Sequence, residues 1–144
     1  MKRYIRSFAV TKREIQSDLR ASAKIVIEHL IKIFLYPDAQ ENNHWKREVA
    51  AALSDVPKMK GSSKLPKSKF ILDSSWMAWE DLFDRKVKVV KEDMVEEAKP
   101  ITTDKLYIAV DHYFKWISCE LSQYGSVSYS SIYREIGYLQ QTYF

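Results

Sequence analysis

Apolar residues recur at every third or fourth position along most of this chain, which is the pattern of amphipathic helices. The longest such stretch covers residues 11–36. Thr11 and Glu14 have the spacing of a capping box at its start, and Pro37 ends it because proline cannot continue the helical hydrogen bonds. We therefore expect one long N-terminal helix. Its apolar stripe consists of Ile15, Leu19, Ala23, Val26, Leu30, Ile33 and Phe34.

The same spacing predicts four more helices. The second runs from an N-cap at Asn43 to about Leu53 or Val56, and the third from Asp73 to about Ala98. The fourth runs from Thr103 to Tyr124, where Gly125 is expected to stop it in a left-handed conformation, and a short fifth from about Ser130 to Gln140. Short connections favour antiparallel neighbours. The predicted fold class is all-α, an up-and-down bundle of four main helices with a short fifth C-terminal helix. The stripes of these helices contain Trp45, Val49, Ala52, Trp76, Trp79, Phe83, Val87, Val90, Met94, Leu106, Val110, Tyr113, Ile117, Leu121, Tyr124, Ile132, Ile136 and Leu139.

Length and composition favour a single domain, residues 1–144. The chain has 144 residues, of which 46% are hydrophobic and only three are glycine, so it can bury a core without a metal or disulfide. The single Cys119 cannot form an internal disulfide, which makes a cytoplasmic location the expectation. No apolar run approaches the roughly 18 residues of a membrane span, so we expect no membrane partner.

The sharpest change in composition predicts a basic loop at 57–72. Residues 57–69 combine two prolines, Gly61, three serines and five lysines with no acid. Residues 1–72 carry 15 lysines and arginines against 7 acids, whereas residues 73–144 carry 8 against 12. Lysines near phosphates release counterions, so this loop is the best candidate for contact with an anionic partner, although such asymmetry is also typical of solvated helix faces. The lysines are Lys58, Lys60, Lys64, Lys67 and Lys69.

Residues suited to catalysis or metal binding are few. His29, His44, His112 and Cys119 are the only soft ligands, and no two of them have the spacing of a zinc ligand pair. Three scattered glycines form neither a nucleophile elbow nor a phosphate-binding loop. The acidic run at 92–97 spreads around a helix, as solvated faces do. We predict no catalytic residue, no metal and no cofactor, and hence a protein that is not an enzyme.

Aromatic residues are more numerous near the C-terminus than a short helix can bury. The four tryptophans fall on or beside apolar stripes, so we expect them in the core. The tail adds five tyrosines and one phenylalanine, and amphipathic tyrosines are common at protein interfaces. We interpret Tyr133, Tyr138 and Tyr143 as candidate contacts for a protein partner.

Several short groups of residues between Leu19 and Val90, about half of the chain, form a pattern that can be compared with known families. They are His29 to Lys32, then Tyr36 and Pro37, then Trp45, Glu48 and Val49, and an aromatic and acidic helix at Ala78 to Arg85. In these groups the chain resembles the bacterial family known as domain of unknown function twenty-nine. The resemblance implies an all-helical domain and carries over no catalytic residue or ligand; residues after Pro100 have no counterpart in it.

The hypothesis that these features favour is a small, non-enzymatic cytoplasmic helical protein that binds another protein, for example as a neutralising or antitoxin-like partner. The alternative is a nucleic-acid-binding protein that uses the basic N-terminal half and the lysine loop. A homo-oligomer stays open under either hypothesis. Neither hypothesis identifies the partner.

Overall fold

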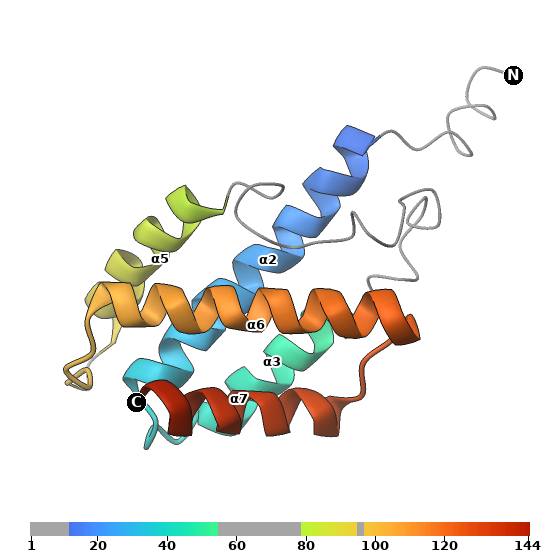
Figure 1. Ribbon diagram of the computed structural model, residues 1–144. Coiled ribbons are helices and arrows are strands. Elements are labelled where there is room, and N and C mark those ends of the chain that lie inside the picture. The colour runs from blue at the N-terminus through green and yellow to red at the C-terminus, as the bar shows by residue number, and fades with distance from the viewer. Residues whose placement is uncertain (1–11, 55–78, 95–96) are drawn as a thin grey trace, which may run out of the picture.

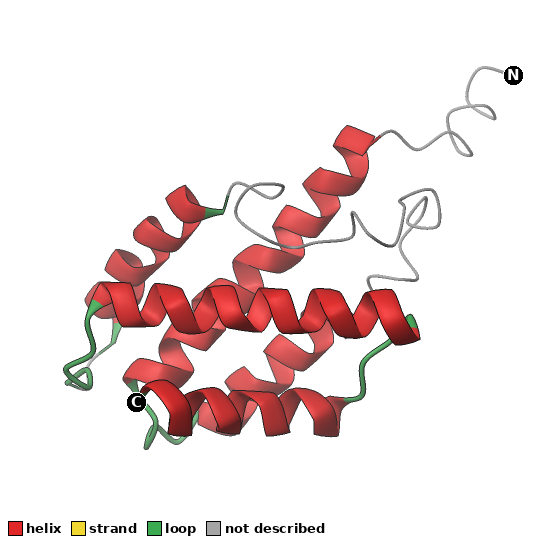
Figure 2. Cartoon of the chain, in the orientation of Figure 1, coloured by secondary structure: helices red, strands yellow, loops and turns green. Residues whose placement is uncertain are grey.

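The computed structural model describes residues 12–54, 79–94 and 97–144, and five helices form within these ranges. They are α2 (Lys12–Leu35), α3 (Asn42–Ser54), α5 (Glu80–Asp93), α6 (Thr103–Tyr124) and α7 (Tyr129–Tyr143). The described residues contain no strand (Figure 2), so the predicted all-α class is confirmed for this part of the chain. None of these five helices is long and apolar enough to cross a membrane.

Helix α2 is the element on which the others assemble. Helices α3, α5 and α6 each pack against α2, and α7 packs against α3 and α6. Figure 1 shows α6 and α7 side by side in front of α2 and α3, which they cross at an angle. Because the two helix pairs cross at an angle, the predicted up-and-down bundle is not confirmed.

The buried core follows the predicted apolar stripes closely. Among the members whose side-chain burial the structure describes, all are buried except Ala52 and Met94, which are half-buried, and Tyr124, which is 69% exposed. An aromatic cluster joins α5 to α6, with the Trp79 ring 4.9 Å from that of Tyr107 and 5.2 Å from that of Phe114. Tyr124, in the last turn of α6, continues the apolar stripe in sequence but lies at the surface.

Helix α6 has the predicted bounds and is capped at both ends. The Thr102 side chain accepts a hydrogen bond from the Lys105 N–H at 3.2 Å, so Thr102 is the N-cap. Gly125 adopts φ 76°, the left-handed conformation that glycine tolerates best, and its N–H donates to the Leu121 carbonyl. The prediction for Gly125 is therefore confirmed.

The C-terminal end of α2 receives donors from two other segments. The buried Asn42 side chain donates through Nδ2 to the carbonyls of Tyr36 at 3.2 Å and of Ile33 at 3.4 Å. The Lys99 N–H donates to the Leu35 carbonyl at 2.8 Å. The last carbonyls of a helix lack partners within the helix, so these bonds fix both segments against the end of α2.

The predicted third helix ends too late in the sequence. Helix α5 stops at Asp93, and Met94 is already extended at φ −90° and ψ 135°, whereas the prediction continued to Ala98. Lys99 lies outside any helix and donates its N–H to α2. The predicted start at Asp73 lies outside the described residues.

Two other boundaries also differ from their predictions. Helix α3 already includes Asn42, so Asn43 lies inside the helix and is not its N-cap. Helix α7 continues to Tyr143 instead of stopping at Gln140. Tyr143 and Phe144 pack against the core, and the Phe144 ring lies 4.9 Å from that of Phe34, which accounts for the longer helix.

Candidate functional site

The five candidate lysines of the basic loop lie outside the described residues, so their role stays a prediction. The three candidate tyrosines all lie on α7. They are spaced five residues apart, and a helix turns by about 100° per residue, so successive tyrosines point about 140° apart. The structure therefore does not bring Tyr133, Tyr138 and Tyr143 together on one face.

Tyr143 faces α6 and not the outside of the molecule. Its hydroxyl lies 2.9 Å from Nδ1 of His112, and its ring packs against the imidazole at a centroid distance of 5.9 Å. Tyr133 and Tyr138 are 37% and 51% exposed. Of the three candidates, only these two are available to a partner, and Tyr143 links α7 to α6.

The outward side of α7 is a tyrosine-rich surface with little charge. Seven residues of α7 are exposed, and Arg134 is the only charged one. By helical rotation, Tyr129 and Tyr133 lie along one edge of this surface and Tyr138 along the other. Gly137 lies between them, and no atom lies within 4 Å of the position that its Cβ would occupy. We call this surface the α7 face. It consists of the half-buried Gly137 and six of the exposed residues, Tyr129, Ser130, Tyr133, Arg134, Tyr138 and Gln141.

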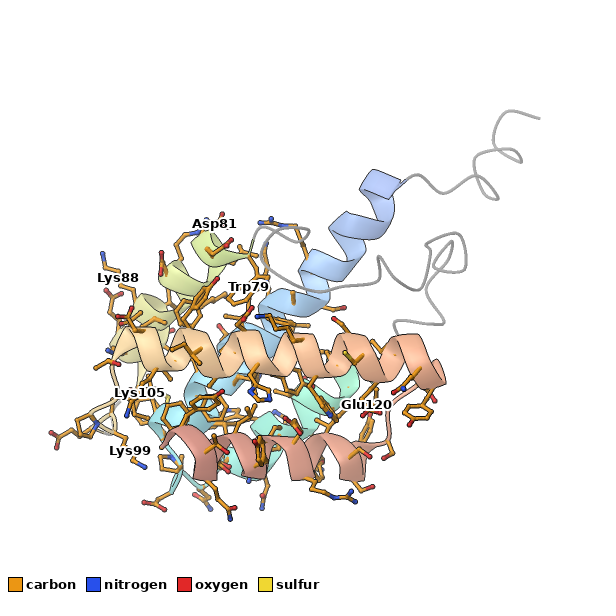
Figure 3. The ribbon with its side chains drawn as sticks, viewed as in Figure 1. Trp79, Asp81, Lys88, Lys99, Lys105 and Glu120 are labelled. Atoms are coloured by element: carbon orange, nitrogen blue, oxygen red, sulfur yellow. The ribbon has the colours of Figure 1, made fainter. Side chains whose placement is uncertain are left out.

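Helix α5 shows how different a solvated face of the same molecule is. Nine of its residues are exposed, and eight of them are charged, with Val89 as the exception. Figure 3 shows Asp81 and Lys88 on α5 pointing away from the body of the molecule. The scarcity of charge on α7 is therefore a local property and not one of the whole surface.

A cleft of about 290 Å³ lies between α6 and α7 beside this surface. Its walls are Trp116 and Glu120 from α6 and Ser131, Arg134, Glu135 and Tyr138 from α7. Glu120 lies toward the α7 side of α6 in Figure 3. Tyr138 and Arg134 belong to both the cleft and the α7 face, so the two features are continuous.

Glu135 is a charged group in the walls of the cleft with only 14% of its side chain exposed. Burial raises the pKa of its carboxyl, the nearby His112 lowers it, and the negative charge of Glu120 raises it. Oε1 of Glu135 lies 3.6 Å from Nε2 of His112. Burial also raises the pKa of the Tyr113 hydroxyl, and the charge of Glu135 raises it further.

This arrangement is better suited to binding than to proton transfer. Both ring nitrogens of His112 face protein groups, because Nδ1 contacts Tyr143 and Nε2 faces Glu135. A general base needs a ring nitrogen within hydrogen-bond reach of its substrate. Within the described ranges, no three His, Cys, Asp or Glu side chains are placed to hold a metal ion.

A second hollow, of about 750 Å³, lies between the α2–α3 turn and residues 97–100. Its lining comes from these two connecting segments and mixes Asp38, Glu97 and Lys99 with Pro37 and Pro100. It gathers no aromatic surface comparable to the tyrosines of α7, since the one aromatic residue in its lining, Tyr36, is only 4% exposed. The α6–α7 region is therefore the stronger candidate site.

Sequence reasoning found two residues of this site, Tyr133 and Tyr138, and missed the rest. The low charge of residues 129–143 was visible, because Arg134 and Glu135 are their only charged residues. The cleft could not be read from the sequence, because it needs the pairing of α6 with α7. Comparisons of the chain with protein-family models, curated proteins and solved structures give no match. The resemblance to the family of unknown function stays a prediction.

Proposed function

We propose that the protein acts without catalysis by binding a protein partner through the α7 face. The observation that carries this proposal is the composition of that surface: three exposed tyrosines around a glycine, with one charge among the seven exposed residues of α7. Protein interfaces are enriched in tyrosine and arginine, and their centres are depleted of other charged residues. The α7 face has both properties.

Physical reasons favour tyrosines in this role. A tyrosine offers a large contact area and a hydroxyl while immobilising only two side-chain torsions, so little conformational entropy is lost on binding. Charged side chains would have to be desolvated before a partner could cover them. Covering the α7 face requires the desolvation of few charges, whereas covering the exposed side of α5 would require many.

The nucleic-acid alternative depends on the lysine loop and therefore stays a prediction. A surface that binds a phosphate backbone needs several lysines or arginines. The α7 face offers only Arg134. This surface therefore favours a protein partner over a nucleic acid.

Gly137 allows a sharp test of the proposal. A Gly137→Glu substitution places a charged side chain in the middle of the α7 face, where the open space avoids any clash with the fold. Glutamate is also a better helix former than glycine, so α7 should be retained. Val89→Glu on α5 is the matched control, because it introduces the same side chain at a position that is 39% exposed.

The experiment captures partners with the tagged full chain from a nuclease-treated lysate of its native cells. We expect the wild type and Val89→Glu to retain the same protein and Gly137→Glu to lose at least nine-tenths of it. Sedimentation of the purified chains shows in parallel whether the partner is a second copy. Equal capture by all three chains, or capture abolished by nuclease, would overturn the proposal.

A further inference from the structure

The cleft between α6 and α7 brings two carboxylates together with one guanidinium. Glu120 and Glu135 come from different helices, and Arg134 lies next to Glu135 on α7. Both carboxylates line the same cleft of about 290 Å³, so their negative charges lie near each other. With both carboxylates ionised and Arg134 protonated, the charges in the cleft sum to about −1, which a single positive charge would neutralise.

Aromatic rings complete the walls of the cleft. The Trp116 ring is half-buried and lies 5.8 Å from the ring of Tyr113, which is fully buried. The Tyr138 ring meets the His112 imidazole edge-to-face at 5.9 Å. Each ring is thus held by a neighbour on α6, which limits its motion. Ammonium and guanidinium groups are attracted to the faces of such rings as well as to carboxylates.

The volume of the cleft limits what it can take. Sites for complete small molecules have about 300–1,000 Å³. This cleft, with about 290 Å³, lies at the small end of that range and has room for a single long side chain. Because Tyr138 and Arg134 also belong to the α7 face, a partner bound there would reach the cleft at its edge.

We propose that the cleft binds one lysine or arginine side chain of the protein partner, between Trp116 and Tyr138 and beside Glu120 and Glu135. The inference rests on the proposed function, because it supplies a charged anchor for the same partner. A cation in the cleft would relieve the repulsion between the two carboxylates, which a neutral side chain cannot do. Charge complementarity therefore selects this occupant.

The test uses the ¹⁵N-labelled full chain and follows the indole N–H signal of Trp116, assigned with a Trp116→Phe variant. The probes are N-acetyl-arginine amide and N-acetyl-lysine amide, with N-acetyl-leucine amide as the neutral control. We expect a saturable shift with at least one cationic probe and none with leucine. Glu120→Gln should weaken that binding at least fivefold, and added salt should weaken it further.

A second variant separates this inference from the proposed function. Gly137→Glu should abolish partner capture while Trp116 still responds saturably to the cationic probes and not to leucine amide, because Gly137 is not part of the cleft lining. A response to leucine amide equal to that of the cationic probes, or unchanged binding in folded Glu120→Gln protein, would overturn the inference. Loss of capture by Gly137→Glu would then still support the α7 face as a binding surface.

Discussion

The Nδ1 atom of His112 on α6 and the hydroxyl oxygen of Tyr143 on α7 lie 2.9 Å apart. In the tautomer that carries its proton on Nε2, Nδ1 accepts a hydrogen bond from the Tyr143 hydroxyl. The Nε2–H group then faces the Glu135 carboxylate at 3.6 Å. One side chain of α6 therefore holds α7 at two points about two turns apart. These two contacts fix the rotation of α7 about its axis, and with it the residues that face outward.

The hydrogen bond between His112 and Tyr143 should contribute measurably to stability. Tyr143→Phe removes only the hydroxyl, so we expect a loss of about 1 kcal/mol in the free energy of unfolding and about 3 °C in Tm. Urea and thermal unfolding followed by circular dichroism measure both. Tyr129→Phe is the matched control, because Tyr129 is 46% exposed on the same helix, and it should change stability by less than about 0.5 kcal/mol. Equal losses in the two variants would contradict this prediction.

Ionisation of Glu135 should lower the stability of the folded protein as the pH rises. Its pKa in the folded protein is raised above its ordinary value of 4.5, chiefly by burial. The folded chain therefore binds this proton more tightly than the unfolded chain, so the stabilisation is complete below the ordinary pKa and is lost as the pH rises through the raised value. Glu135→Gln removes the ionisation, so its stability relative to wild type should increase over that pH interval and then level off.

Chemical unfolding of both chains between pH 4 and pH 8 measures this difference. Glu120→Gln is the informative comparison, because loss of its charge removes the smaller of the two effects that raise the pKa of Glu135. It should change the stability of the protein in the same direction but by less than Glu135→Gln does. If the stability of Glu135→Gln relative to wild type falls as the pH rises, the assignment is contradicted.

The sequence predicts the described helices well because each is defined by its own apolar spacing. Val26 and Leu30, for example, are buried as their positions in the stripe require. The end of α5 could not be predicted, because residues 94–98 contain neither glycine nor proline to mark it, and the hydrogen bond of Lys99 to Leu35 joins positions far apart in the sequence. Long-range contacts of this kind leave no periodic signal.

The candidate site was only partly predictable for a similar reason. Helical spacing gives the angles between Tyr133, Tyr138 and Tyr143, but packing decides which of these side chains face the solvent. Sequence spacing identifies His112 only as one of four soft ligands without a zinc-pair spacing, and it predicts none of the contacts of His112 with α7. Its two partners there follow only from the way in which α6 and α7 pack together.

Asn42 should stabilise the corner between α2 and α3 more than its neighbour Asn43 does. The Asn42 amide is buried and donates to the carbonyls of Ile33 and Tyr36, which Asn42→Ala would leave without that donor. We expect a loss of about 1–2 kcal/mol in the free energy of unfolding. Asn43→Ala should change it by less than about 0.5 kcal/mol, since Asn43 is exposed and alanine is a better helix former. Urea unfolding midpoints of the two variants test this order, and similar values would contradict it.

Gly125 and Gly137 should respond in opposite ways to the same substitution. Neither glycine has an atom within 4 Å of the position of an added Cβ, so sterics do not distinguish them. Gly125 has φ 76°, where an L-residue is strained, so Gly125→Ala should destabilise the protein by about 1 kcal/mol. Gly137 lies within α7, so Gly137→Ala should stabilise the protein by about 0.5–1 kcal/mol through its higher helix propensity. Denaturant midpoints measured for both variants decide the matter, and a change of the same sign in both would show that backbone conformation is not what separates these two positions.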